Sequence, residues 1–357
     1  MTGPPKVVGP ATKTATRPAN LLPQWLIDGA HIDKRESFDA KKHLNFEPPS
    51  RIYTMTEIGL EGQGISPHAV SEPFPLFTED SVTQMRAEIF SRQVLDHCQF
   101  ASTFNKNMIR GMGPGRAPFT YSAWNSPELL VKISQVAGIN LVPVFDHDIA
   151  TINISIGSGS LDLTSSLEES SDENLPSVAW HYDSFPFVCV TMLSNCEGMI
   201  GGETVLRTGT GEVMKVRGPA MASFLIPDAT RIILCPVINS GQGTAVVMQG
   251  RYIEHQALQA LGGRERISMV TAFRPKSPFV KDESILTGVR GISVLPDLYS
   301  QYTEYRLEIL EERIRARLET ERQREVAKRR FDTSDARSWL IEQKEFIEAM
   351  LTELYEV

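Results

Sequence analysis

Residues 180–193, WHYDSFPFVCVTML, contain the pattern that decides both the fold and the site. Side chains at positions i and i+2 of a strand point to the same face, so His181 and Asp183 can reach one bound ion together. Most residues from Phe185 to Met192 are aromatic, β-branched or large apolar side chains, which favour a strand. By itself the H-x-D pattern is weak, because a histidine in a strand is usually a hydrogen-bonded structural residue.

A second histidine, His255, follows in residues 250–261, GRYIEHQALQAL. The apolar run before this segment and the glycine that opens it predict a buried strand, a break and a second short strand. Neighbouring strands would bring His255 close to His181 and Asp183. Two imidazoles and one carboxylate form the facial set that holds non-haem Fe(II) and leaves three of six coordination positions open.

Arg266 lies eleven residues past His255, and Ser268 follows it with the same strand parity. One strand face would then present a planar guanidinium and a hydroxyl, which together suit a carboxylate. Arg264 has the same parity and is the alternative anchor. Arg266 is preferred because the apolar, β-branched run at 267–271 follows it directly.

The rival metal group is His147 between Asp146 and Asp148. Both acids adjoin the histidine and would point to the opposite strand face, so this segment is expected to end a turn before a strand at 149–156. The histidines without a carboxylate at a useful spacing are predicted to be structural or surface residues: His31, His43, His68 and His97.

Taken in order, these five site residues resemble the signature of the Fe(II)/2-oxoglutarate-dependent oxygenase superfamily. The similarity covers roughly residues 120–280, and the runs GGETVLRTGTGEVMKVRGP, GRYIEHQAL and ERISMVTAFRP resemble its fungal branch, whose members often serve secondary metabolism. The resemblance implies a double-stranded β-helix, or jelly roll, with N-terminal and C-terminal helices around it. It also implies Fe(II) at His181, Asp183 and His255, and 2-oxoglutarate as cosubstrate at Arg266 and Ser268.

The activity implied by the resemblance is oxidation of an unactivated C–H bond of a small organic substrate by O2, giving succinate and CO2. An amino acid or a secondary metabolite is the suggested substrate class, with Tyr121, Phe187 and Phe346 as candidate substrate-binding residues. Two alternatives stay open: a cupin-like metal enzyme without 2-oxoglutarate, and a non-catalytic barrel used for binding. The Arg266–Ser268 pair argues against the first, and the complete set of five residues argues against the second.

Composition and charge exclude several other classes of protein. The 357 residues carry a formal charge of −8, whereas a nucleic-acid binder usually shows a basic footprint. No apolar run reaches the eighteen or so residues of a membrane span, and the first twenty residues lack a signal-type apolar segment, so a cytoplasmic protein is expected. The four cysteines have no C-x-x-C spacing, which excludes zinc and thioredoxin-type motifs. Nothing in the sequence indicates the oligomeric state.

The chain is predicted to divide into a disordered tail at 1–20, an oxygenase domain at 21–297 and a helical extension at 298–357. Thr78 and Ser126 are predicted to cap two helices before the strands begin. In the extension, a helix at 298–330 and a second at 333–354 are expected, and the basic run in the first is interpreted as a solvated face.

One segment fits the resemblance poorly. Residues 222–243, ASFLIPDATRIILCPVINSGQG, separate the two halves of the site and contain only Asp228 and Arg231 as charged residues. Two hypotheses follow: an extra hairpin over the site, or an intron translated as protein. A cDNA that encodes these residues in frame would eliminate the second hypothesis.

Overall fold

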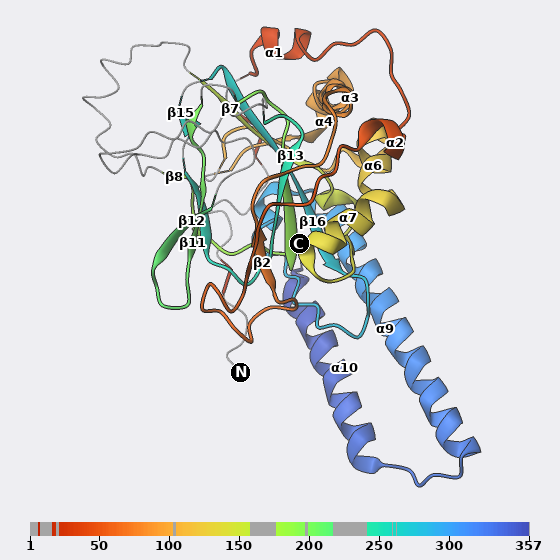
Figure 1. Cartoon of the computed structure of the whole chain (residues 1–357). Coiled ribbons are helices and arrows are strands. Elements are labelled where there is room, and N and C mark those ends of the chain that lie inside the picture. The colour runs from red at the N-terminus through yellow and green to blue at the C-terminus, as the bar shows by residue number, and fades with distance from the viewer. Residues whose placement is uncertain are drawn as a thin grey trace.

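The computed structural model describes residues 6–7, 16–18, 21–102, 105–157, 176–196, 199–216, 241–258, 260–261 and 263–356. Two antiparallel sheets form its centre, with helices around them (Figure 1). Most of the predicted tail, residues 158–175 and residues 222–240 of the unusual segment lie outside the described residues.

The larger sheet runs in the order β1 (Ile52–Thr54), β2 (His68–Ser71), β13 (Thr244–Met248), β9 (Phe187–Met192), β16 (Glu265–Pro275), β7 (Thr151–Ile156), β5 (Met108–Ile109) and β4 (Gln99–Phe100). Two short strands join it at the side, β3 (Phe74–Pro75) on β13 and β6 (Leu141–Pro143) on β16. The smaller sheet has the order β12 (Val213–Val216), β11 (Thr204–Arg207), β14 (His255–Leu258) and β8 (Pro176–His181), and β10 (Ile200–Gly201) pairs separately with β15 (Ala260–Leu261).

The chain alternates between these two sheets. Strands β7, β9, β13 and β16 belong to the larger sheet, and β8, β11 with β12, and β14 belong to the smaller sheet between them in sequence. This alternation is the double-stranded β-helix, so the predicted fold class is confirmed.

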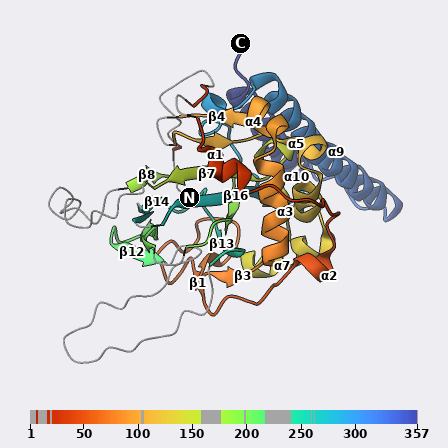
Figure 2. The same cartoon turned by 90° about the horizontal axis from the view of Figure 1, so that it is seen from above.

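Strand parity divides the larger sheet into two chemical faces. On β16, Ile267, Met269 and Phe273 are fully buried in the main hydrophobic core, together with Trp124 on the helical side. The rings of Trp124 and Phe273 lie 5.9 Å apart. Figure 2 shows the helices α3 (Glu79–Ile89) and α7 (Pro127–Ala137) on one side of this sheet and the smaller sheet on the other.

Capping residues set the helix starts as predicted. The Thr78 hydroxyl accepts a hydrogen bond from the backbone N–H of Ser81 at the start of α3, and the Ser126 hydroxyl accepts one from Leu129 at the start of α7. Gly138 ends α7 with a φ of 70°, a conformation that favours glycine. The remaining short helices are α1 (Gln24–Asp28), α2 (Ala40–His43), α4 (Arg92–Cys98), α5 (Gly113–Arg116), α6 (Pro118–Trp124), η1 (Asp146–Asp148) and η2 (Arg290–Ile292).

The C-terminal helices α9 (Leu295–Val326) and α10 (Thr333–Glu353) form an antiparallel hairpin that projects from the body (Figure 1). Their bounds lie close to the predicted ones, and the N-cap of α10 is Asp332, whose side chain accepts a hydrogen bond from the backbone N–H of Asp335. Within the described ranges, no helix is both long and apolar enough to cross a membrane.

Candidate active site

The three predicted metal ligands come together between the two sheets. His181 ends β8 and is the register partner of His255 at the start of β14. Asp183 lies just beyond β8, where its backbone N–H donates a 2.9 Å hydrogen bond to the carbonyl of Gly250. One potential ligand atom from each side chain lies within 4.8 Å of the others, and no other such group of three occurs in the described part of the chain.

Backbone carbonyls orient both imidazoles. Nδ1 of His181 lies 2.8 Å from the carbonyl of Ala179, and Nδ1 of His255 lies 2.9 Å from that of Ile253. Because a carbonyl only accepts, each Nδ1 carries a proton, and in the neutral form of each ring Nε2 keeps its lone pair. The Nε2 atoms lie 3.5 and 3.7 Å from the two carboxylate oxygens of Asp183.

The carboxylate of Asp183 fits a ligand role. Its Oδ2 atom is buried and has no hydrogen-bond partner among the described residues, which is costly unless a cation binds there. The absence of a side chain at Gly250 makes room for it, since a Cβ there would lie 1.7 Å from Oδ2. An orphaned carboxylate oxygen beside two free imidazole lone pairs matches the donor set of a 2-His-1-carboxylate metal site.

The electrostatics favour the ligand forms of Asp183 and His255. Burial lowers the pKa of His255 to about 4, helped by repulsion from His181 when it is charged. Burial opposes ionisation of Asp183, but attraction to His255 and the hydrogen bond with His181 outweigh it and hold its pKa below the ordinary value. The same hydrogen bond overcomes the effect of burial on His181 and raises its pKa, so a metal would compete with a proton there.

A cavity of about 840 Å³ opens from these ligands. Arg266, Ser268, Val270 and Ala272 of β16 all line it, as strand parity requires. The guanidinium of Arg266 makes no hydrogen bond or ion pair within the described ranges, and burial lowers its pKa. The alternative anchor, Arg264, does not line the cavity and instead stacks on Trp25, with 3.6 Å between the guanidinium carbon and the ring centroid.

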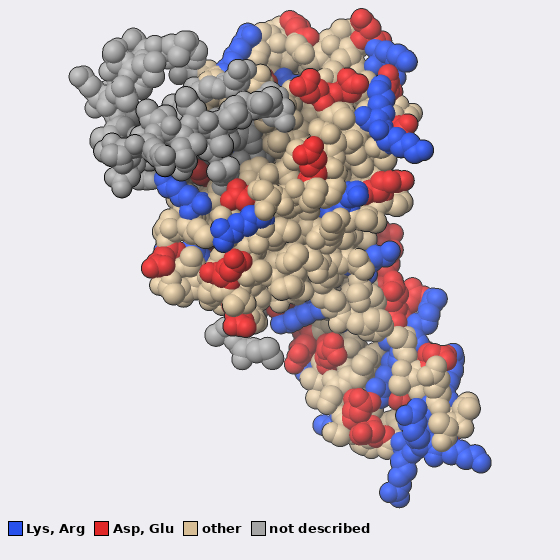
Figure 3. Space-filling model, viewed as in Figure 1, with Lys and Arg blue, Asp and Glu red and all other residues tan. Residues whose placement is uncertain are grey.

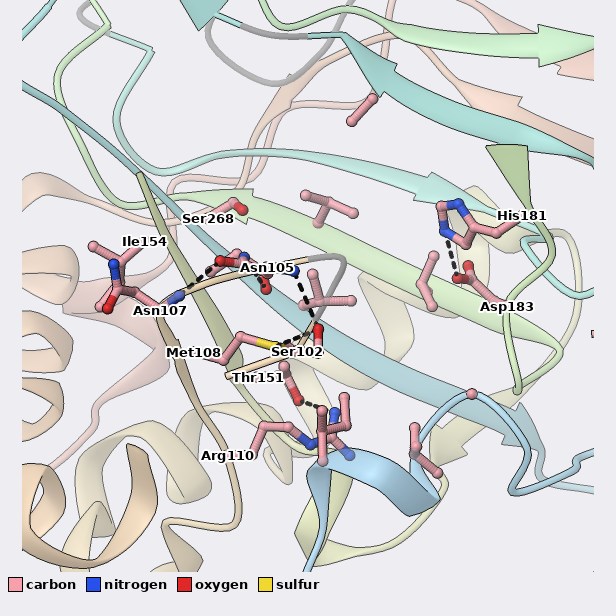
Figure 4. Close-up of a pocket in the computed structure, with 18 of the residues that line it drawn as sticks. Ser102, Asn105, Asn107, Met108, Arg110, Thr151, Ile154, His181, Asp183 and Ser268 are labelled. Atoms are coloured by element: carbon pink, nitrogen blue, oxygen red, sulfur yellow. Dashed lines mark hydrogen bonds and ion pairs between the residues drawn. The ribbon is translucent and has the colours of Figure 1, made fainter. Parts of the chain in front are cut away.

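Another part of the cavity wall, near β5 and β7 of the same sheet, is polar and was not anticipated from the sequence. Arg110 is buried there, with hydrogen bonds to Asp148 (2.7 Å) and Thr151 (3.0 Å). Figure 4 shows Arg110 and Thr151 below the cavity, with Asn105 and other amide side chains on one side and the His181–Asp183 pair on the other. Residues 105–110 carry little periodic signal in the sequence, so only their position against β7 identifies them.

None of the three predicted substrate-binding residues lines this cavity. Phe187 lies in the main core, since it has the opposite parity on β9 from the lining residues Val188 and Val190. The buried Tyr121 hydroxyl donates to the carbonyl of Asp146. Phe346 is buried within the C-terminal hairpin, where the guanidinium of Arg306 stacks on its ring.

The rival histidine, His147, belongs to a different arrangement. It lies in η1, as the predicted turn implied, and β7 starts later than expected, at Thr151. Its neighbour Asp148 is paired with Arg110, and burial lowers the pKa of His147 to about 4. His147 contributes to no potential metal site within the described ranges.

No protein-family model and no curated protein matches the chain. Similar solved structures include an oxidoreductase of the 2OG-Fe(II) oxygenase family from Burkholderia pseudomallei, at 12% identity over 47% of this chain and 65% of that chain, with a TM-score of 0.29. A prolyl-4-hydroxylase from Pseudomonas putida is 19% identical over 56% of this chain and 88% of that chain (TM-score 0.32). AviO1 from Streptomyces viridochromogenes is 13% identical over 58% and 90% (TM-score 0.35). At these TM-scores, all below 0.5, the similarities establish neither family nor function.

Proposed function

We propose that the protein is a non-haem Fe(II)- and 2-oxoglutarate-dependent oxygenase that oxidises an unactivated C–H bond of a small organic substrate. The observation that carries this proposal is the combination of two features in one cavity. The first is the His181–Asp183–His255 group, and the second is the guanidinium of Arg266. Neither the Oδ2 atom of Asp183 nor this guanidinium has a hydrogen-bond partner among the described residues.

Five residues of the cavity would bind the metal ion and the cosubstrate. His181, Asp183 and His255 would hold Fe(II), which supplies oxidation by O2 coupled to conversion of 2-oxoglutarate to succinate and CO2. Arg266 and Ser268 would bind the far carboxylate of the cosubstrate, because a guanidinium presents parallel N–H donors to a carboxylate. The carbonyls bonded to the two Nδ1 atoms hold the imidazoles in the ligating tautomer and so keep the site organised before anything binds.

The distribution of polar and apolar residues on the cavity wall indicates a class of substrate. Val188, Val190 and Met248 form an apolar side, whereas Arg110 and Asn153 belong to a polar side. This division favours a small molecule with one apolar and one polar end, such as an amino acid or a secondary metabolite of mixed polarity. The fungal, secondary-metabolism type and the cytoplasmic location stay predictions from the sequence.

Each of the two alternative functions leaves one feature of the site without a role. A cupin-like metal enzyme without 2-oxoglutarate has no need for a guanidinium on the cavity wall that lacks an ion-pair partner among the described residues. A non-catalytic barrel has no need for an orphaned carboxylate beside two oriented imidazoles. Both features support the oxygenase over these alternatives.

The test is binding of Fe(II) and 2-oxoglutarate without O2. We expect a weak visible charge-transfer band when both are added, its loss in His181→Ala, and a need for more 2-oxoglutarate in Arg266→Ala. His97→Ala is the control, because the His97 ring is exposed and bonds only to the carbonyl of Gln93 in its own helix. Absence of the band in the folded wild type would exclude the proposal, and a band that survives His181→Ala would exclude this ligand set.

A further inference from the structure

Exposed apolar side chains concentrate on the C-terminal hairpin. Across the described residues, fifteen large hydrophobic side chains are exposed, and ten of them lie between residues 295 and 356. They are Leu307, Ile314, Leu318, Val326, Phe331, Leu340, Ile341, Ile347, Leu351 and Tyr355. Single exposed apolar residues are ordinary, but a cluster of this kind marks an interaction surface.

Six of these residues form two matching stripes. Leu307, Ile314 and Leu318 on α9 have the spacing i, i+7, i+11, and Leu340, Ile347 and Leu351 on α10 have the same spacing. At 100° per residue, such residues share one side of a helix. We call this set of six the outer face.

Both stripes lie on the same side of the hairpin. On α9, the residues that contact α10 are Arg306, Arg313 and Arg317, and the α9 stripe is rotated by about 100° from them. On α10, the stripe is rotated by about 100° in the same sense from Gln343 and Phe346, which contact α9. Because the helices run in opposite directions, equal rotations bring both stripes to one side.

The other side of the hairpin packs on the body. Tyr302, Tyr305 and Ile309 are buried in one hydrophobic cluster with Phe145 and Leu286 of the body. On the α9 helical wheel these three residues lie on the opposite side of the α10 contact from the stripe. The outer face is therefore directed away from the rest of the chain.

The two stripes are centred at one level along the hairpin. The middle of the α9 stripe is near Arg313, and the middle of the α10 stripe is near Phe346. The Arg313 guanidinium lies 4.5 Å from the centre of the Phe346 ring and bonds to Gln343 at 3.4 Å. A two-fold axis at this level, lying in the plane of the outer face and perpendicular to the helices, would therefore lay the apolar stripes of two copies against each other.

Charge is distributed unevenly along the hairpin. Its free half, residues 313–342, holds nine basic and six acidic residues, whereas its attached half, residues 295–312 and 343–356, holds two basic and nine acidic residues. Figure 3 shows Lys and Arg gathered at the free end. Among the exposed charged residues with no ion pair in the described part of the chain, the free half holds five basic and four acidic residues, whereas the attached half holds acidic residues alone. The free-half residues are Arg322, Lys328, Arg329, Arg330 and Arg337 with Glu319, Glu325, Asp332 and Glu342, and the attached-half residues are Asp297, Glu304, Glu308, Glu312, Glu345 and Glu356.

We propose that the outer face binds a second copy of this chain, with the two hairpins antiparallel in a two-fold dimer. In that arrangement the basic free half of each hairpin lies against the acidic attached half of its partner. About a centre at Arg313, Glu304 would face Arg322 of the other copy, and Leu307 would face Leu318. Such self-complementarity is what an isologous contact requires.

The dimensions allow this arrangement. From Arg313, α9 extends ~20 Å to its free end and ~27 Å to its first residue, at 1.5 Å per residue, so each free end stops short of the partner's body. An overlap of ~30 Å by ~20 Å, the width of two helices, buries roughly 600 Å² on each copy. The total of about 1,200 Å² is at the lower limit for a specific interface.

Sedimentation equilibrium of the full chain tests the proposal. Between 1 and 100 µM we expect a reversible shift from 39.8 kDa toward twice that mass. Ile314→Lys should weaken dimerisation at least tenfold, because it places a charge at the centre of the contact. Ile341→Lys is the matched control, since Ile341 is similarly exposed on α10 but rotated away from the outer face. Circular dichroism would verify that both variants are folded.

A charge-swap experiment tests the antiparallel orientation. Arg322→Glu with Arg329→Glu, and separately Glu304→Lys with Glu308→Lys, should each reduce self-association, while a mixture of the two variants should form a heterodimer. A wild type that stays monomeric at 100 µM overturns the proposal. Dimerisation that is insensitive to Ile314→Lys, or a mixture that fails to associate, also overturns it.

Discussion

Gly250 offers the sharpest test of the metal centre, because it touches the site without contributing a side chain. Its φ lies outside the positive region, so alanine is compatible with the backbone there, and the only obstacle is steric. The new Cβ would lie 1.7 Å from Oδ2 and 2.6 Å from the carboxylate carbon of Asp183. We therefore expect Gly250→Ala to displace this carboxylate while the fold persists.

The size of the effect follows from these distances. Relief of the clash requires a shift of ~1.5 Å, whereas metal–ligand distances tolerate only about 0.2 Å. Asp183 would thus stop acting as a ligand, and two neutral imidazoles would remain. Changes that only disturb ligand orientation lower metal affinity by about 10–100-fold, so loss of the only anionic ligand should lower it by at least about 100-fold.

The assay is anaerobic calorimetric titration with Fe(II), with thermal unfolding of the metal-free protein as the test of the fold. Gly115→Ala is the control: a Cβ at Gly115 has no atom within 4 Å, and its φ is also outside the positive region. A folded Gly250→Ala protein that binds Fe(II) with wild-type affinity would refute the assignment of Asp183 as a ligand in this geometry.

Three further predictions address other parts of the site and the core. Arg266→Ala should raise the KM for 2-oxoglutarate in steady-state assays by about 10–100-fold, because charge-assisted hydrogen bonds are lost. The affinity for Fe(II) should stay unchanged in this variant. Arg264→Ala should change neither the KM nor the Fe(II) affinity. The pKa of about 4 at His147 means that the unfolded chain takes up this proton near pH 6.5 and the folded chain only near pH 4. The free energy of unfolding should consequently fall as the pH drops through that window, by up to about 3 kcal/mol from this residue. Urea unfolding at pH 7 and 4.5 should show a smaller loss of this free energy in His147→Gln than in the wild type. An equal loss in both proteins would contradict the burial argument. Phe187→Ala should lower the free energy of unfolding by about 3–5 kcal/mol; at a temperature where the variant is folded, an altered KM for substrate would show that Phe187 reaches the cavity after all.

Local rules accounted for the starts of two helices and for the alternation of side chains along the strands. A hydroxyl at Thr78 or Ser126 caps its helix through backbone groups three residues away, so neighbours in sequence are sufficient to predict it. Alternation along β16 is also local, and it separates Arg266 and Ser268 from Ile267 and Met269 without knowledge of the partner strands.

Parity alone did not identify the substrate side of the cavity. Phe187 is an aromatic residue near the metal motif, yet the register of β9 places its ring in the main core together with Trp124. The sequence around Arg110 gives no signal of its position, because that position depends on Asp148 and Thr151, which lie about forty residues further along the chain.

The sequence by itself predicted the strands, the helix caps at Thr78 and Ser126, and the His181–Asp183 and Arg266–Ser268 pairs, because each depends on side-chain types at short, fixed spacings. The addition of His255, 72 residues after Asp183, rested on the order of these motifs. Tertiary structure alone decided that Arg264 stacks on Trp25 while Arg266 lines the cavity, and that Gly250 leaves room for Asp183. It also decided that α9 and α10 present their apolar stripes on one side. The physical reason is the same in each case: these outcomes depend on steric contacts between segments distant in sequence, and periodicity within one segment carries no information about them.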